Sequence, residues 1–534
     1  MITAPIVLPP PSDFGLEAYP SYYPYQDQAV LHCYENPLGS RVTGVCLPTG
    51  CGKSLLAAML YVLSGKRVVV LTSTKALQGQ YHRLFGAAPL EIADIRGQNA
   101  YQCRVADGVT VDRGPCHAGW DCPYREGGCY YFDAVGRARD GAFVATNYTY
   151  WMTMQQYGKG LGNVDILVCD EADTMLNEIT AFLSLSFQGG DIQKHLHAAL
   201  PPVDSSIEAV RLWAGGLLPR IKSRQESLET QMKIFSQSSE QPPGPFRREV
   251  REVNLLKDAL TRAADLHGEW VAEWAERNHR LNLWPVWPAD YAEEVLFRGI
   301  PRVILMSATL SRKQMEILNR GPWDYVDYPS AIPPEDRPVR HVRSVAMRRG
   351  MQNLPLWTAR IDQLIERRLD RKIILHTTSY ERKRAFMLGS RFKGKGILIS
   401  HDSGDLETAV QRFKAMEAPA VLVSPSLTRG YDFPGVQCET LILGKVPYMD
   451  GRTPLAKARK ERDPDYLNYE AMMTMQQEAG RGARYVGDRC EILVVDDDWR
   501  WFWPRFGYMA SQWFRDAVQP GVFDVQNTEP LAKL

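Results

Sequence analysis

Residues 47–54 read Leu47-Pro48-Thr49-Gly50-Cys51-Gly52-Lys53-Ser54, and an apolar, helix-like run follows directly at residues 55–60. A glycine-rich turn that opens a helix can wrap its backbone around a phosphate, and the free N–H groups at the helix start favour negative charge. The lysine can reach the β- and γ-phosphates, and the hydroxyl after it can bind Mg²⁺. The stretch therefore predicts an α/β fold in which residues 49–54 bind a nucleoside triphosphate.

Short apolar, β-branched runs recur on both sides of this turn, with helical patterns between them. Strands that are apolar throughout are typical of parallel sheets with helices on both faces. The runs fall into two sets and predict two α/β domains that meet near residue 325. The first set is 68–71, 166–169 and 303–306, and the second is 373–375, 421–423, 441–443 and 492–495.

The composition excludes several classes of protein. The 534 residues are 45% hydrophobic and 23% charged, which excludes a wholly disordered or collagen-like chain. The net charge of +1 gives no sign of a nucleic-acid partner, so any basic surface must be local. The sequence contains no run of the roughly 20 apolar residues that a membrane span needs and no secretory signal, so we expect a cytoplasmic protein that does not bind membranes.

An acidic tetrapeptide, Asp170-Glu171-Ala172-Asp173, comes directly after the strand at 166–169. The carboxyl ends of strands are where α/β sheets bind ligands. We therefore expect Asp170 to bind Mg²⁺ together with Ser54, and Glu171 to orient or deprotonate the attacking water. Strand context and the upstream phosphate loop argue against the alternative, a solvated acidic loop.

A third candidate element is Gln477-Glu478-Ala479-Gly480-Arg481-Gly482-Ala483-Arg484. Two arginines three residues apart share one helix face. Their guanidinium groups suit phosphate oxygens, and an arginine finger contributes about 10³–10⁵ in rate. We expect Gln477, Arg481 and Arg484 to complete the catalytic site from the second domain.

Four of the ten cysteines, Cys103, Cys116, Cys122 and Cys129, fall within 27 residues. In a reducing compartment such a cluster is more often a metal site than a disulfide framework. Structural zinc sites favour closely paired cysteines, whereas the gaps here are 12, 5 and 6 residues. Spacing alone leaves zinc and an iron–sulfur cluster as near-equal alternatives.

The stretch from about 180 to 284 has a different pattern. An apolar seam with spacings of three and four predicts one long helix that contains Val253, Leu256, Leu260, Ala263, His267, Trp270 and Trp274. Ile221, Leu228, Met232 and Phe235 predict a partner helix, and the polar, proline-rich residues 236–245 predict the loop between them. A helical hairpin is therefore expected to interrupt the first domain.

These elements, in this order, resemble superfamily 2 helicases. Tyr25-Gln26-Asp27-Gln28 is similar to the adenine-reading element, with Gln28 as the expected reader, and Ser307-Ala308-Thr309 is similar to the coupling motif. By resemblance Gly430 and Asp432 belong to the nucleotide site. Residues expected by resemblance to grip the DNA backbone are Thr72, Thr74, Lys75, Thr377, Ser379 and Thr428.

The four cysteines and the hairpin make the layout similar to the XPD/DinG-type iron–sulfur helicases, in their bacterial and phage DinG-like form. The resemblance implies two RecA-like motor domains, ATP and Mg²⁺, a [4Fe–4S] cluster on the four cysteines, and 5′-to-3′ translocation on single-stranded DNA with unwinding of forked or tailed duplexes. The expected parts are the first motor domain (1–95, 136–179 and 285–325), the iron–sulfur domain (96–135), the helical arch-like insertion (180–284) and the second motor domain (326–534). The acidic box ends in Asp173, where relatives often carry histidine, and Arg429 stands where many carry an acid.

Other functions stay open at this point. A DNA-stimulated translocase that remodels protein–DNA or R-loop structures without processive unwinding would have the same sequence. An RNA helicase is a second alternative, and a scaffold with a retired nucleotide site is a third. The scaffold is disfavoured because Lys53, Glu171 and both arginines are present. A monomer suffices for the mechanism, and a bacterial or phage-infected cell is the expected setting.

Overall fold

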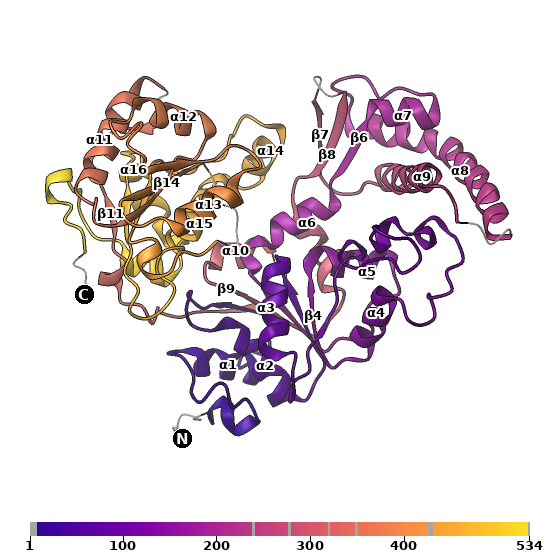
Figure 1. Ribbon diagram of the computed structural model, residues 1–534, viewed down its shortest axis with the longest axis horizontal. Coiled ribbons are helices and arrows are strands. Elements are labelled where there is room, and N and C mark those ends of the chain that lie inside the picture. Colours follow the sequence, from indigo (N-terminus) through magenta and orange to yellow (C-terminus); the bar gives the residue numbers. More distant parts are fainter. Residues whose placement is uncertain are drawn as a thin grey trace.

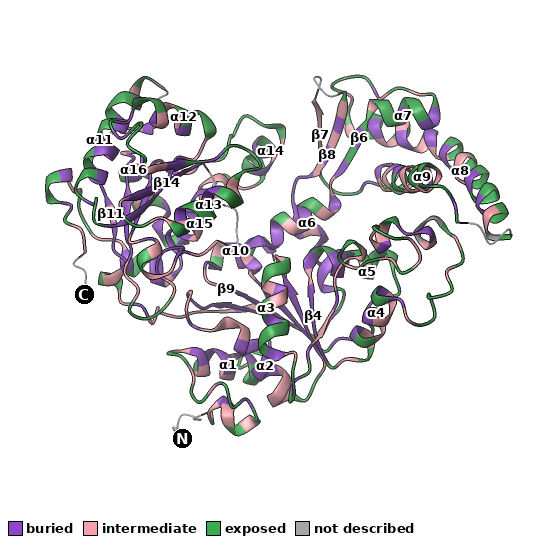
Figure 2. Ribbon diagram, in the orientation of Figure 1, coloured by how far each residue is buried: buried purple, intermediate pink, exposed green. Residues whose placement is uncertain are grey.

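The computed structural model describes residues 8–237, 241–275, 279–318, 321–347, 351–425, 427 and 431–531. Two parallel sheets with flanking helices form separate bodies, and a third, antiparallel sheet stands beyond the first (Figure 1). The two parallel sheets are buried almost throughout (Figure 2). No helix within the described ranges is long and apolar enough to cross a membrane.

The first sheet has seven strands that pair in parallel throughout. In spatial order they are β10 (Trp323–Asp327), β1 (Val42–Cys46), β9 (Arg302–Ser307), β5 (Ile166–Asp170), β2 (Val68–Thr72), β4 (Phe143–Asn147) and β3 (Ala93–Asp94). Its helices are α1 (Gln26–Glu35), α2 (Lys53–Ser64), α3 (Lys75–Phe85), α4 (Tyr130–Asp140), α5 (Tyr148–Tyr157), α6 (Met175–Leu183) and α10 (Arg312–Leu318). The predicted boundary at residue 325 falls inside β10, so the first domain extends at least to Asp327.

The second sheet has six parallel strands. They are β11 (Val339–His341), β16 (Glu491–Val494), β15 (Thr440–Leu443), β12 (Lys372–His376), β14 (Ala420–Ser424) and β13 (Leu398–Ser400). Its helices are α11 (Leu354–Glu366), α12 (Tyr380–Gly389), α13 (Leu406–Ala415), α14 (Pro454–Arg462), α15 (Tyr466–Ala479), α16 (Trp499–Phe506) and α17 (Gln512–Ala517). The prediction of two parallel-sheet α/β domains is confirmed.

The insertion after α6 is only partly helical. It contains α7 (Gly189–Leu196), α8 (Ile207–Gln237) and α9 (Gly244–Ala264), but also an antiparallel sheet of β6 (Leu185–Gln188), β8 (Arg280–Pro285) and β7 (Trp270–Ala275). The hairpin of α8 and α9 is as predicted. The prediction that its second helix continues through His267, Trp270 and Trp274 is wrong, because α9 ends at Ala264 and the two tryptophans lie in β7.

Between the end of α9 at Ala264 and the start of β7 at Trp270 the chain turns, and Gly268 there has a positive φ of 76°. Trp270 and Trp274 are four residues apart, a spacing that puts two side chains on one face of a strand as well as of a helix. Periodicity therefore could not separate the two structures here.

A buried arginine of the second domain holds the base of this insertion. Arg459 on α14 is 4% exposed, and its guanidinium donates to the Val286 carbonyl at 2.9 Å and to the Thr180 hydroxyl at 3.1 Å. Thr180 lies just before the insertion leaves the first domain, and Val286 lies just after it returns. Nearby, Arg462 pairs with Asp290 at 2.9 Å. We call the two segments at Thr180 and Val286, where the chain enters and leaves the insertion, the neck of the insertion.

Candidate active site

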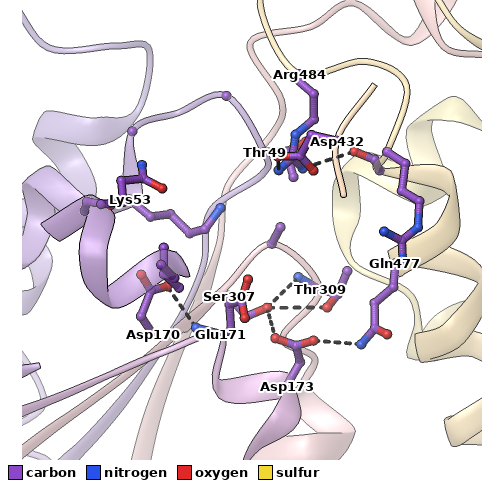
Figure 3. A pocket seen from close by; sticks show the side chains of 18 of the residues that line it. Thr49, Lys53, Asp170, Glu171, Asp173, Ser307, Thr309, Asp432, Gln477 and Arg484 are labelled. Atoms are coloured by element: carbon purple, nitrogen blue, oxygen red, sulfur yellow. Dashed lines mark hydrogen bonds and ion pairs between the residues drawn. The ribbon is translucent and has the colours of Figure 1, made fainter. Parts of the chain in front are cut away.

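A cavity of about 500 Å³ lies between the two parallel-sheet domains. It opens at the carboxyl ends of the strands of the first sheet, where the loops after β1, β2, β5 and β9 meet (Figure 3). The first domain supplies Thr49, Gly50, Gly52, Lys53, Ser54, Asp170, Glu171 and Asp173 to its lining, and the second supplies Asp432, Gln477, Arg481 and Arg484. Residues more than 400 positions apart in the sequence thus line the same cavity.

The lysine and the acids of the first domain are held in place by their neighbours. Lys53 begins α2, and its Nζ lies 3.3 Å from the Leu47 carbonyl oxygen. Asp170 ends β5 and is 2% exposed. It accepts hydrogen bonds from the Tyr81 hydroxyl at 2.9 Å and from the Glu171 N–H at 2.8 Å. Burial raises the pKa of Asp170, and nearby Lys53 and the Tyr81 hydroxyl oppose that rise.

Glu171 is turned into the cavity by its backbone. Its φ is +50°, in the left-handed region that L residues rarely adopt, and its carboxylate accepts a hydrogen bond from the Ser73 hydroxyl. Strain of this kind persists only where the surrounding structure enforces it, and it clusters at functional sites. The arrangement gives Glu171 one defined position beside the phosphate loop.

The structure places Gln26, and not the predicted Gln28, in contact with the phosphate loop. Gln28 is exposed on α1, whereas Gln26 is fully buried and donates to the Gly52 carbonyl at 2.7 Å. Gln26 also accepts from the Tyr23 N–H at 3.0 Å, and Tyr23 lines the cavity. Gln26 is therefore the glutamine in contact with the phosphate loop. Both glutamines belong to the predicted tetrapeptide at residues 25–28. They differ in which face of α1 they occupy, and the sequence does not show which face contacts the loop.

The phosphate loop packs directly against the second domain. Gly50 has a φ of 85°, and a Cβ there would lie 2.2 Å from the Arg484 carbonyl oxygen. Only glycine allows this approach. The Thr49 hydroxyl is buried without a hydrogen-bond partner, while Cys51 is buried behind the loop. An oxyanion in the loop would satisfy the Thr49 hydroxyl.

Asp173, which sequence reasoning passed over as a departure, joins the two domains. One carboxylate oxygen accepts from the Ser307 hydroxyl at 2.5 Å, and the other accepts from Gln477 Nε2 at 2.7 Å (Figure 3). Ser307 is the last residue of β9, and Gln477 lies on α15 of the second domain. The acidic box, the Ser-Ala-Thr segment and the Gln477 helix thus meet in one hydrogen-bond chain. In the sequence, the only sign of this role was that the acidic tetrapeptide ends in Asp173, where relatives often carry histidine.

The two arginines have different partners. Arg481 is 6% exposed, pairs with Glu478 at 2.9 Å and donates to the carbonyls of Leu427 and Tyr431 at 2.9 and 3.1 Å. Arg484 is more open and pairs with Asp432 at 2.5 Å. In this conformation Arg481 fastens the segment after β14, and Arg484 is the arginine closer to the phosphate loop. Gly430 lies outside the described residues.

The residues expected to grip DNA divide into two groups. Thr72 and Thr377 are buried, and each hydroxyl donates to a carbonyl two residues further on, at 3.2 Å in both domains. Thr74 and Ser379 instead cap α3 and α12, where each accepts from a backbone N–H at 3.2 Å. Lys75 is exposed beside Thr74, while Thr428 lies outside the described residues. Exposed N–H groups at two equivalent helix starts suit phosphate oxygens.

The aromatic C-terminal segment also reaches the site. Trp513 lines the cavity, and its indole N–H donates to the Ala308 carbonyl at 2.7 Å. Beside it, Ser511 binds the Gln476 side chain at 2.5 Å, and the Gln512 N–H donates to Asp327 at 2.8 Å. Arg337 stacks over the Trp513 ring at 4.3 Å. This segment thus ties α15 to the Ala308 loop and to the end of β10 in the first domain.

The four clustered cysteines lie on a loop with little regular structure, between Arg96 and α4. Within it are only short 3₁₀ turns, among them η3 (Val111–Arg113) and η4 (Pro115–Ala118). Burial raises the pKa of Cys116 to about 11, and the other three cysteines add to that rise, so they lie close enough to act on the Cys116 thiol. Among the described residues no three His, Cys, Asp or Glu side chains are placed to hold one metal ion.

The donor set is four thiols, which is the ligand chemistry of a [4Fe–4S] cluster and also of a Cys₄ zinc site. The six remaining cysteines are buried elsewhere in the two motor domains.

Comparisons with known proteins agree on the fold. Residues 363–517 match the family model of the helicase C-terminal domain. An XPD helicase structure aligns with a TM-score of 0.63 at 15% identity and covers 98% of this chain and all of its own. Xpd4 from S. tokodaii aligns at 0.60 and 14% identity over 94% of this chain and all of its own, and an apo XPD structure at 0.56 and 15% identity over the same shares. No curated protein sequence matches. The chain has the fold of these XPD structures, and most of its second sheet domain matches the family model of the helicase C-terminal domain.

Proposed function

We propose that the protein is an ATP-dependent DNA helicase of the XPD/DinG type that moves 5′-to-3′ on single-stranded DNA and unwinds duplexes. One observation carries the proposal. The cavity between the two sheet domains gathers the phosphate loop, the acidic box and the Gln477–Arg484 segment, which are the parts that ATP hydrolysis between two motor domains requires. A helicase domain in residues 363–517 supports it. DNA and polarity rest on the resemblance.

In this proposal ATP binds with its phosphates in the loop at residues 49–54. Lys53 moves from the Leu47 carbonyl to the β- and γ-phosphates. Ser54 and Asp170 would hold Mg²⁺, which would neutralise phosphate charge. Glu171, fixed by Ser73, orients the water for in-line attack and accepts its proton. Gln26 would fix the adenine end through its bond to Gly52.

Hydrolysis depends on domain closure because the site is divided. On closure the Arg484 guanidinium leaves its ion pair with Asp432 and binds the γ-phosphate instead. Arg481 keeps the segment after β14 in position. The chain from Ser307 through Asp173 to Gln477 forms only with both domains together. Such a site is complete only when closed, which ties each hydrolysis to one opening and closing.

The strand is gripped from two equivalent helix starts. Thr74 and Lys75 at α3, and Ser379 at α12, contact the phosphodiester backbone, while Thr72 and Thr377 shape the loops that present them. Contacts of this kind are salt-sensitive and indifferent to base sequence. Thr428 is assigned to the same groove by resemblance.

We further propose that Cys103, Cys116, Cys122 and Cys129 hold a [4Fe–4S] cluster, which supplies the structural core that this loop lacks. Iron and acid-labile sulfide per chain, with the visible absorption, test this directly. Cys122→Ser should lose iron and the absorption, and Cys33→Ala, outside the loop, should keep both. Stoichiometric zinc in place of iron would contradict the assignment.

The function is tested by ATP-dependent unwinding of matched duplexes with a 5′ or a 3′ single-stranded tail. Unwinding from the 5′ tail only, abolished by Lys53→Ala, is the expected result. Unwinding from the 3′ tail only would reject the polarity. ATPase activity stimulated by single strands without unwinding would instead indicate a translocase that remodels nucleoprotein complexes.

A further inference from the structure

Helix α3 lies against two surfaces of the first domain that have separate expected tasks. Its first residue, Lys75, and its N-cap, Thr74, belong to the surface proposed to grip the strand. The same helix also lines the cavity between the two sheet domains, through Leu77, Gln80 and Arg83. A single helix of 11 residues can therefore carry a displacement from one surface to the other.

Tyr81, in the second turn of α3, extends from this helix to the acids of the cavity. Its side chain is fully buried, and its ring centroid lies 6.1 Å from that of Phe85 in the core on one face of the first sheet. Its hydroxyl donates to the Asp170 carboxylate at 2.9 Å. Burial and the Asp170 carboxylate raise the pKa of Tyr81, and a hydrogen bond with the Ser54 hydroxyl opposes that rise. The Tyr81 oxygen therefore interacts with both Ser54 and Asp170.

Ser54 and Asp170 are the two residues proposed to hold Mg²⁺, and they come from different elements, the start of α2 and the end of β5. The two oxygens of the Asp170 carboxylate have separate partners, because Oδ1 accepts from the Glu171 N–H and Oδ2 accepts from Tyr81. Groups that bond to metal ligands fix the orientation of those ligands, and their loss costs about 10–100-fold in metal affinity or activity. A hydroxyl that interacts with both residues at once also fixes their separation.

The segment before Tyr81 contacts the second acid of the site. The Ser73 hydroxyl, two residues before α3, donates to the Glu171 carboxylate. Thr74 and Lys75 follow Ser73, Thr74 as the N-cap of α3 and Lys75 exposed beside it. In the sequence, the two contacts with the acids thus flank the two residues proposed to grip the strand, so a load on those residues acts on a segment that is bonded to both acids.

We propose that Tyr81 is a positioning residue, which holds Ser54 and Asp170 in place for Mg²⁺ and makes their arrangement respond to a strand bound at the start of α3. This inference rests on the proposed function, and it names the side chain through which single-stranded DNA would stimulate ATP hydrolysis. A strand phosphate at Thr74 and Lys75 loads the first turn of α3. Because Tyr81 lies six residues after Lys75, or about 9 Å along the axis of the same helix, its hydroxyl moves with that turn.

The test measures binding of fluorescent ADP over a range of Mg²⁺ concentrations, with and without single-stranded DNA. Tyr81→Phe keeps the buried ring and removes only the hydroxyl, so the Mg²⁺ concentration at half-maximal binding should rise about tenfold, while ADP affinity in EDTA should stay unchanged. DNA should lower this Mg²⁺ midpoint in the wild type but not in Tyr81→Phe. Tyr150→Phe is the matched control, because this buried tyrosine of the same domain has its hydroxyl 3.2 Å from that of Tyr131. It should keep the wild-type midpoint.

Three outcomes would overturn the proposal. An unchanged Mg²⁺ midpoint in Tyr81→Phe would show that the hydroxyl serves packing only, and an equal rise in Tyr150→Phe would assign the effect to the stability of the domain. A DNA effect that is absent from the wild type, or equal in the wild type and Tyr81→Phe, would remove the link to the strand. The DNA-stimulated ATPase of the wild type is measured in parallel. Its absence would contradict the proposed function, whereas its presence with any of these outcomes would contradict only the role of Tyr81.

Discussion

The hydrogen-bond chain through Asp173 predicts how far ATP hydrolysis depends on contact between the two domains. Asp173→Asn keeps the size of the side chain but removes its charge and turns an amide N–H₂ toward Ser307 or Gln477. A hydrogen bond to a charged group contributes about 1.5–3 kcal/mol, and the lower value applies because Asp173 is half-buried. Since the bond to Gln477 joins the domains, its loss should weaken closure by about 1.5 kcal/mol, or roughly tenfold in rate.

The assay is the kcat of the DNA-stimulated ATPase in a double-mutant cycle. Asp173→Asn and Gln477→Ala should each lower kcat about tenfold, and the double variant should lose little more than either alone, because both remove the same bond. Asp191→Asn, which removes an exposed acid on α7, should leave kcat unchanged. Independent losses that multiply to about 100-fold in the double variant would refute a direct role for this pair in closure.

Three further outcomes are expected. Gln26→Ala should raise the KM for ATP about tenfold by releasing Gly52, whereas Gln28→Ala should leave it unchanged, and steady-state kinetics distinguishes the two. Trp513→Phe keeps the packing but loses the N–H bond to Ala308, so kcat should fall about fivefold for a bond of about 1 kcal/mol, with an unchanged urea midpoint as the check on folding. Burial raises the pKa of Asp496 from 3.8 to about 6. The folded state therefore holds this proton more tightly than the unfolded chain, so wild-type stability relative to Asp496→Asn should rise as the pH falls from about 6 toward 4 and should stay level above 7. A flat difference in urea midpoint across that range would contradict it.

The sequence predicted the parallel sheets because their strands are buried on both faces and read as unbroken apolar runs. It mispredicted β7, since a spacing of four residues satisfies a strand and a helix equally. It predicted Gln28 as the adenine reader, whereas Gln26 is the glutamine that contacts the phosphate loop, because a motif match within one or two residues does not fix which side chain faces that loop.

Partners across the domain interface were beyond the reach of sequence reasoning. Asp173 and Gln477 are 304 residues apart, and nothing local to either shows that they meet. Arg481 shows a similar limit within the second domain, because its bond to the Leu427 carbonyl depends on how the chain after β14 returns to α15. The Trp513 segment carried no motif, so only its position in the fold reveals its contact with Ala308.

Arg459 attaches the neck of the insertion to the second sheet domain, so a movement of that domain is transmitted to the whole insertion. Both segments of the neck are hydrogen-bonded to the Arg459 guanidinium on α14. A rotation of α14 during domain closure should therefore tilt the insertion about its neck. With 31 residues at 1.5 Å each, α8 is about 46 Å long, and a tilt of about 5° along it displaces its far end by about 4 Å. Under the proposed function, small motions at the cavity between the two sheet domains would gain amplitude at the outer end of α8.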